Sequence, residues 1–128
     1  MVAPIIPGLN DSEIPVILKA AKKAGAQTAG YILLRLPLTV EPVFKEWVKR
    51  TQPLQAEKIL GRIRQTRGGE MSESTFGKRM VGSGEIAGQI RNMFQLFRKQ
   101  LGMDKKLKRH NCDLFERPLP DPDQRRLF

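Results

Sequence analysis

A strand, a helix and a second strand follow one another within the first 36 residues, and this order constrains the fold more than any other feature. Residues 2–6 form a short run that favours a strand, and Pro7-Gly8 ends it. Residues 28–36 form a second strand whose centre is apolar on both faces, a pattern typical of a parallel strand buried on both sides. The order predicts an α/β fold that contains a βαβ unit.

The segment between the strands predicts an amphipathic helix. Three residues in a row, Asn10, Asp11 and Ser12, are candidate N-caps, and Gly25 is a suitable residue to follow the last turn. Apolar side chains recur at helical spacing, at Ile14, Ile17, Leu18 and Ala21.

A second helix is expected after Pro37, with Val43, Trp47 and Val48 on one apolar face and Trp47 in the core. This gives the order β-α-β-α. Two strands alone do not form a stable sheet, and strands that are buried on both faces need neighbours. Because residues 2–6 begin directly in such a strand, we expect a preceding portion of the protein that completes the sheet. The expected fold class is therefore α/β, as a partial (β/α) barrel segment.

The rest of the chain predicts a helical, basic C-terminal extension. A helix is expected over residues 55–67, and a longer one follows Ser83 after a glycine-rich stretch. We divide the chain into a βαβα segment (1–54), a helical extension with a glycine-rich loop (55–102) and a flexible, basic, proline-containing tail (103–128).

The charge of the chain favours polyanionic partners. There are 23 Lys and Arg residues against 13 Asp and Glu, a net charge of +10. Residues 1–60 carry 8 bases and 5 acids, whereas residues 61–128 carry 15 and 8. Such an excess attracts nucleic acid above all.

Cysteine and hydropathy exclude several classes. The single cysteine, Cys112, excludes an intrachain disulfide and any all-cysteine metal cluster within this chain. No apolar run approaches the ~20 residues of a membrane span, and the first residues lack the basic start of a signal peptide. We expect a cytoplasmic location.

Two stretches resemble a known family. The first joins residues 3–11 to the strand Ala-Gly-Tyr-Ile-Leu-Leu-Arg-Leu-Pro at 29–37, and it looks like the later strands of a radical S-adenosylmethionine (SAM) enzyme barrel. The second comprises residues 67–69, 74–80 and 82–84, and it resembles the C-terminal extension of the spore photoproduct lyase-related group, often labelled DNA repair photolyase-like.

The resemblance implies an enzyme of which this chain is only the C-terminal portion. In that family a CxxxCxxC motif holds a four-iron four-sulfur (4Fe–4S) cluster, which cleaves SAM reductively to a radical. This chain has no such motif, so it should be inactive alone. The implied cofactors of the parent protein are SAM and the 4Fe–4S cluster, and the implied partner is the missing N-terminal radical SAM portion.

The resemblance also implies cofactor-binding residues. The family's GxIxGxxE motif helps to hold the adenosyl part of SAM, and here Ile6 and Gly8 match its Ile and second Gly. Pro4 stands in place of the first Gly, and Asp11 stands in place of Glu with a shorter reach. The alternative is a simple turn between strand and helix.

Four basic residues are candidate substrate contacts. Arg35 lies at the end of the second strand, where it could bind a carboxylate or phosphate, and the alternative is an ion pair with a neighbouring loop. Arg67, Lys78 and Arg79 flank the glycine-rich stretch and could contact phosphate, although no Walker or GxGxxG pattern is present. The alternative is a solvated basic loop.

The last five residues, Gln-Arg-Arg-Leu-Phe, resemble the short peptides by which bacterial repair and replication proteins dock on the sliding clamp. In such a peptide Leu127 and Phe128 would enter an apolar pocket, and Gln124 would fix the register.

Two functions therefore follow from the sequence. The first is a C-terminal portion of a radical SAM enzyme that contributes part of the SAM pocket and of the substrate surface, in DNA repair or nucleic-acid modification. The alternative is a stand-alone basic nucleic-acid-binding module without catalytic activity, whose binding would weaken steeply with salt.

Overall fold

The computed structural model describes residues 1–106 and 111–116. All the expected strands and helices are present in it. Their order is β1 (Val2–Ile5), a short 3-10 helix η1 (Asp11–Glu13), α1 (Ile14–Lys23), β2 (Tyr31–Leu33), α2 (Val40–Thr51), α3 (Ala56–Gln65) and α4 (Gly84–Gln100). The second strand is shorter than the predicted stretch 28–36.

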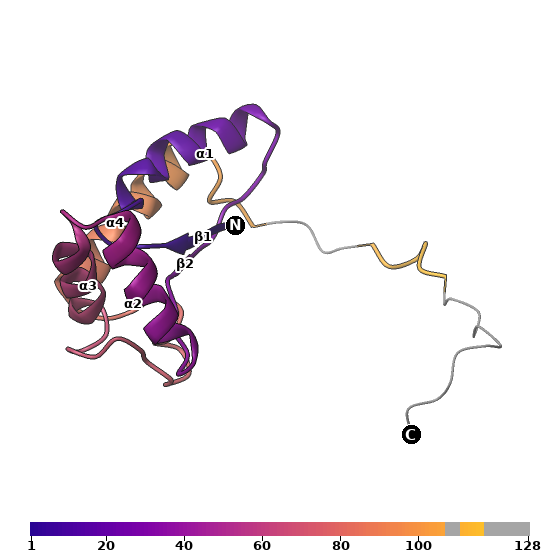
Figure 1. Cartoon of the computed structure of the whole chain (residues 1–128). Coiled ribbons are helices and arrows are strands. Elements are labelled where there is room, and N and C mark those ends of the chain that lie inside the picture. The colour runs from indigo at the N-terminus through magenta and orange to yellow at the C-terminus, as the bar shows by residue number, and fades with distance from the viewer. Residues whose placement is uncertain (107–110, 117–128) are drawn as a thin grey trace, which may run out of the picture.

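The two strands pair in parallel, as the βαβ order requires (Figure 1). Val2 lies opposite Tyr31 and Ile5 opposite Leu33, with an irregularity in the register between them. The crossover between the strands contains η1 and α1. Among the described residues the sheet has these two strands, so its membership of a larger barrel stays a prediction.

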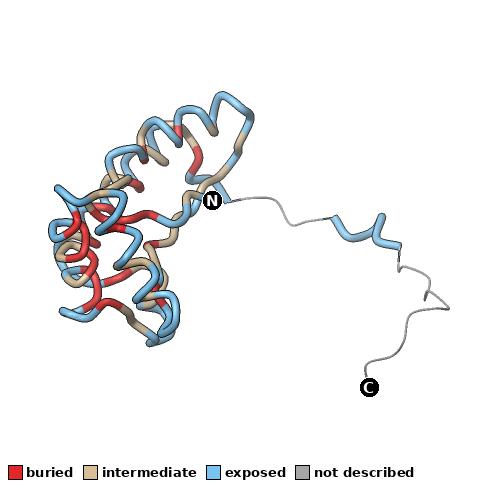
Figure 2. Tube along the Cα trace, in the orientation of Figure 1, coloured by how far each residue is buried: buried red, intermediate tan, exposed pale blue. Residues whose placement is uncertain are grey.

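Successive strand residues point to opposite faces of the sheet, and each face has its own core. Ile5 packs with residues of α1 and α4, whereas Ile6 packs with residues of α2 and α3. The first core contains Ile5, Ile14, Leu18, Leu33, Ala87, Ile90 and Phe94. The second contains Ile6, Leu36, Val48, Ala56, Ile59, Leu60, Ile63 and Met71. Figure 2 shows the buried residues on the inner sides of the helices and at the end of β1.

The helical extension helps to build both cores. Helix α4 contacts α1, and α3 contacts both α2 and α4. The glycine-rich segment, residues 68–85, also reaches the sheet, because the N–H of Leu33 donates to the carbonyl oxygen of Met80 at 2.9 Å. This segment gives β2 a hydrogen-bonding neighbour that the strand pattern of the sequence does not reveal.

The expected core position of Trp47 is wrong. Val48 is fully buried, but Trp47 is 36% exposed and Val43 is 66% exposed. Helix α2 carries apolar side chains on more than one face, and the face with Phe44 and Val48 packs against the core. Phe44 still contacts the ring of Trp47, at 5.7 Å between centroids.

The helical segment begins one 3-10 turn before α1. Asn10, one of the predicted N-caps, is the N-cap of η1, and Glu13 is the N-cap of α1, but neither side chain makes a capping hydrogen bond. The polar side chains of Asn10 and Asp11 fold back onto the turn that precedes them. No helix within the described part of the chain is long and apolar enough to cross a membrane.

Candidate functional site

The two strands end at the same edge of the sheet because they run in parallel. The turn after β1, residues 6–11, and the segment after β2, residues 34–38, both lie at this carboxyl edge. Ligands of α/β proteins bind outside the carboxyl ends of strands. The candidate site is therefore built from these two segments and their neighbours.

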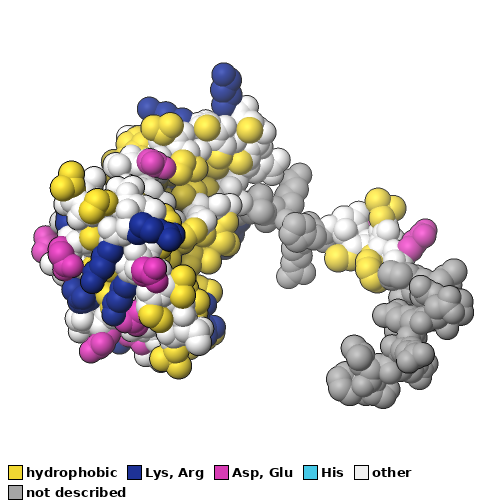
Figure 3. All heavy atoms as spheres, viewed as in Figure 1, with side chains coloured by type: hydrophobic (Ala, Val, Ile, Leu, Met, Phe, Trp, Pro, Cys, Tyr) yellow, Lys and Arg dark blue, Asp and Glu magenta, His cyan; other side chains and the backbone are white. Residues whose placement is uncertain are grey.

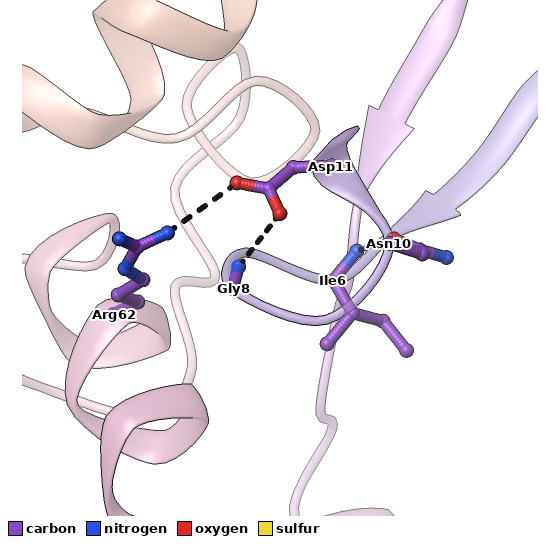
Figure 4. Close-up of polar contacts among 5 residues, drawn as sticks. All are labelled: Ile6, Gly8, Asn10, Asp11 and Arg62. Atoms are coloured by element: carbon purple, nitrogen blue, oxygen red, sulfur yellow. Dashed lines mark hydrogen bonds and ion pairs between the residues drawn. The ribbon is translucent and has the colours of Figure 1, made fainter. Parts of the chain in front are cut away.

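The turn after β1 is held by its own side chains (Figure 4). The N–H of Ile6 donates to Oδ1 of Asn10 at 2.7 Å, and the N–H of Gly8 donates to Oδ1 of Asp11 at 3.0 Å. The amide of Asn10 donates in turn to the carbonyl oxygen of Pro4 at 3.2 Å. These bonds satisfy backbone N–H groups that a ligand would otherwise find free.

Arg62 of α3 closes the side of this turn. Its Nη1 lies 3.6 Å from Oδ2 of Asp11, and both side chains are partly exposed. A Cβ built on Gly8 would lie 2.8 Å from Cδ of Arg62. The structure thus brings Ile6, Gly8 and Asp11 together, as the family motif implies, but uses the Gly8 N–H and the Asp11 carboxylate within the chain. The Arg62 side chain thus occupies the space next to Gly8 on the side that faces α3.

A cavity of about 390 Å³ lies at the carboxyl end of β2. Its lining comes from the end of β2 and from the glycine-rich segment, namely Arg35, Pro37, Leu38, Ser72, Glu73 and Ser74. The guanidinium of Arg35 makes one weak contact, 4.0 Å from Nη1 to Sδ of Met80. The described ion pairs are Lys45–Glu41 and Arg62–Asp11, so Arg35 has no carboxylate partner among the described residues.

Arg67 lies behind this cavity and is only 4% exposed. Its Nη2 donates to the carbonyl oxygen of Leu34 at 2.7 Å, and its Nη1 donates to that of Lys78 at 3.3 Å. Burial lowers the pKa of Arg67; Glu73 opposes this effect, and the like charge of Arg35 adds to it. Arg67 thus ties β2 to the glycine-rich segment and adds a positive charge near Arg35.

Glu73 is the one carboxylate in the cavity lining. Hydrogen bonds from Thr75, first from its side chain and then from its backbone N–H, hold the pKa of Glu73 below its usual value. The N–H of Thr75 lies 2.8 Å from Oε1. Lys78 acts in the same direction through its charge, so Glu73 stays ionised at neutral pH.

The remaining predicted substrate residues lie outside this lining. Lys78 is exposed and accepts a hydrogen bond from Arg67 through its backbone. The guanidinium of Arg79 lies over the ring of Phe76, 5.5 Å from its centroid. On the face of the molecule drawn in Figure 3, Lys and Arg side chains are interleaved with Asp and Glu. Of the four basic residues, Arg35 is the one that lines this cavity.

Several residues of the site escaped the sequence patterns. No local sequence pattern marked Arg62 as a site residue, because its contacts with Gly8 and Asp11 join segments that are far apart in the chain. The sequence around Ser72 and Ser74 predicted a loop and did not indicate a binding site. The clamp-type peptide with Gln124, Leu127 and Phe128 lies outside the described residues.

A metal cluster does not fit this chain. Its single cysteine, Cys112, cannot form the three-cysteine motif of the family, and no group of three potential metal ligands occurs among the described residues.

Comparisons with known protein families, with curated proteins and with solved structures find no match to this chain.

Proposed function

We propose that this chain is the C-terminal portion of a radical SAM enzyme of the spore photoproduct lyase-related type, and that the chain forms part of the substrate surface. The parent enzyme acts on a nucleic-acid-related substrate. The N-terminal portion would supply the CxxxCxxC motif that holds the cluster, and the cluster would supply the chemistry of reductive SAM cleavage. The part played by the present residues is to bind and orient.

One observation carries this proposal: the turn at Gly8 and the cavity at Arg35 lie at the same carboxyl edge of a parallel strand pair. In barrels and in open parallel sheets, this edge is where substrates and cofactors meet. The shared edge supports a joint role for the two segments.

The two segments contribute differently. The cavity at Arg35 has an arginine without a carboxylate partner and is open to an anionic group. At the turn around Gly8, the Gly8 N–H donates to Asp11, and the carboxylate of Asp11 forms an ion pair with Arg62. We therefore assign the substrate contact to Arg35, and we assign a SAM contact to Ile6, Gly8 and Asp11.

The DNA upstream of the Met1 codon tests the proposal. Translation of its three forward frames is expected to show a CxxxCxxC motif followed by βα segments. If no frame contains them, the proposal is wrong, and the stand-alone nucleic-acid-binding module becomes the better account.

The excess of bases in residues 61–128 favours that second candidate. A non-specific polyelectrolyte contact loses affinity steeply as salt rises, because binding releases counterions from the nucleic acid. Binding of the full chain to single-stranded DNA, measured by fluorescence anisotropy over a range of salt concentrations, separates the two candidates. A steep slope without any effect of SAM supports the binding module.

A further inference from the structure

The lining of the cavity at the carboxyl end of β2 carries one basic and one acidic side chain, Arg35 and Glu73. Within the described part of the chain, the guanidinium of Arg35 makes one hydrogen-bonding contact, with the sulfur of Met80, and no ion pair. Arginine is always charged at neutral pH and presents a fork of N–H donors suited to oxyanions. An arginine at a cavity wall with its donors unused by any carboxylate is placed to bind an anion.

Arg67 adds a second positive charge that interacts with the charge of Arg35. Its two described hydrogen bonds go to carbonyl oxygens, which accept protons but carry no full negative charge to balance it. The charges of Arg35 and Arg67 repel one another, although the attraction between Glu73 and Arg67 is larger than this repulsion. A bound anion relieves the repulsion.

The cavity also offers neutral donors. Ser72 and Ser74 line it, and their hydroxyl groups make no hydrogen bond with any described residue. Glu73 lies between them in sequence, but Thr75 binds its carboxylate within the loop. The loop thus presents two hydroxyl groups to the cavity, and the carboxylate of Glu73 in the same lining is held by Thr75.

We propose that this cavity binds a phosphate group, with Arg35 as its charged partner and the hydroxyl groups of Ser72 and Ser74 as further donors. A phosphate group presents three or more oxygens in a tetrahedral arrangement, so it can accept from donors on different walls. A carboxylate presents two oxygens in one plane and suits a single arginine. The cavity volume of about 390 Å³ lies within the usual range of small-ligand sites.

This inference rests on the proposed function only in assigning the phosphate to a nucleic-acid-related substrate. The binding site itself needs neither SAM nor an N-terminal portion. Phosphate binding and the upstream reading frame are therefore tested separately, and either can fail alone.

The test is a titration of the ¹⁵N-labelled full chain with inorganic phosphate, followed by NMR at constant ionic strength maintained with chloride. Amide shifts are expected at residues 35 and 72–74. Acetate, titrated in the same way, is expected to bind more weakly. Arg35→Gln is expected to weaken phosphate binding about tenfold, because it removes a charge-assisted hydrogen bond.

Three further variants make the test specific. Arg79→Gln removes the same charge outside the cavity lining and is expected to change the dissociation constant less than about twofold. Glu73→Gln removes the nearby negative charge and is expected to tighten binding. Arg35→Lys keeps the charge without the fork of donors, and it replaces Arg35→Gln as the test should that variant fail to fold.

Equal weakening by Arg35→Gln and Arg79→Gln would show general surface attraction and would overturn the proposal. Shifts centred on another surface, or acetate binding as tight as phosphate, would also overturn it. Competition by a 5′-mononucleotide or by a single-stranded oligonucleotide identifies a terminal or a backbone phosphate as the source. If inorganic phosphate binds and neither competes, the site stands but its link to a nucleic-acid substrate is wrong.

Discussion

The side chain of Arg62 fills the space where a Cβ on Gly8 would lie. The distance from that position to Cδ of Arg62 is 2.8 Å, and the backbone of Gly8 has a φ of +85°. The close approach lets α3 pack against the turn after β1 and lets Arg62 reach Asp11. Gly8 is therefore favoured by the positive φ of the turn, and a side chain at this position would also have to displace Arg62.

The substitution Gly8→Ala is expected to lower the free energy of unfolding by about 2 kcal/mol, because backbone strain at positive φ adds to the contact with Arg62. Gly25→Ala is the matched control. Gly25 has a φ of +91° but nothing within 4 Å of the added Cβ. Its expected loss is about 1 kcal/mol, from strain alone.

Urea denaturation of the two glycine variants measures the difference. In an Arg62→Ala background the extra loss at Gly8 should disappear, leaving only the loss due to strain. Equal losses for Gly8→Ala and Gly25→Ala in the parent chain would contradict the account, because they would show that Arg62 yields at no cost.

Asp11 has two roles in the turn, and two substitutions separate them. Asp11→Asn keeps an oxygen for the Gly8 N–H but loses the charge opposite Arg62. The expected loss in the free energy of unfolding is below about 1 kcal/mol and smaller at high salt, since the ion pair is partly exposed. Asp11→Ala loses the hydrogen bond as well, and we expect a loss of about 1–2 kcal/mol.

The comparison of the two Asp11 variants at low and high salt is the measurement. A salt-dependent loss in Asp11→Asn assigns the stabilising effect to the pair with Arg62. If Asp11→Asn were as unstable as Asp11→Ala, the hydrogen bond to Gly8 would contribute nothing, contrary to its 3.0 Å geometry.

The secondary structure was readable from the sequence because it depends on local patterns. The apolar run that ends in Leu34 has side chains for both faces of the sheet, and the structure places Leu33 in one core and packs Leu34 against the other. Of the predicted helical stripe, Ile14 and Leu18 are buried in the core, whereas Ile17 is 37% exposed. Patterns of period two and 3.6 carry this information directly.

The site was less readable because its contacts join distant segments. The pattern marks Asn10 and Asp11 as N-caps, yet their side chains bond the preceding turn, where the N–H groups of Ile6 and Gly8 lie closer. Nothing in the sequence near Arg67 shows that its guanidinium is buried against Leu34. Such pairings depend on how the helices pack on the sheet.

Helix α2 gives a direct test of which apolar side chains form the core. Val48→Ala removes a fully buried side chain, so we expect a loss of about 2 kcal/mol in the free energy of unfolding. Trp47→Ala removes a larger but partly exposed side chain, and its expected loss is about 1 kcal/mol or less. Far-UV circular dichroism in urea is the measurement, since Trp47 is the sole tryptophan. If Trp47→Ala lowered the free energy of unfolding more than Val48→Ala does, Trp47 would belong to the core after all.

Arg67 is expected to stabilise the fold through its two bonds to carbonyl oxygens. Arg67→Met keeps an apolar chain of similar length but leaves the carbonyl oxygens of Leu34 and Lys78 without this donor, for an expected loss of about 2–4 kcal/mol. Arg64→Met is the control, because the side chain of Arg64 makes no described hydrogen bond; its expected change is within about 0.5 kcal/mol. Similar thermal midpoints for the two variants would refute the bridging role.

The loop of Glu73 should respond to acid in a way that Thr75 controls. Because hydrogen bonds from Thr75 lower the pKa of Glu73 from its ordinary 4.5, the folded loop favours the carboxylate over the acid. The resulting stabilisation is fully present above the pKa of the unfolded chain and is lost as the pH falls through the lower, folded pKa. Thr75→Val removes the side-chain hydrogen bond, which is the largest cause, so the pKa should rise toward 4.5.

An NMR titration of the Glu73 side-chain carboxyl group measures this pKa in the parent chain and in Thr75→Val. The backbone N–H of Thr75 still bonds the carboxylate in the variant, so part of the lowering should remain. Glu73→Gln identifies the resonance, because its titration disappears. An unchanged midpoint in Thr75→Val would mean that the hydroxyl group does not hold the carboxylate, and that Glu73 is free to turn toward Arg35 and compete with an anion for it.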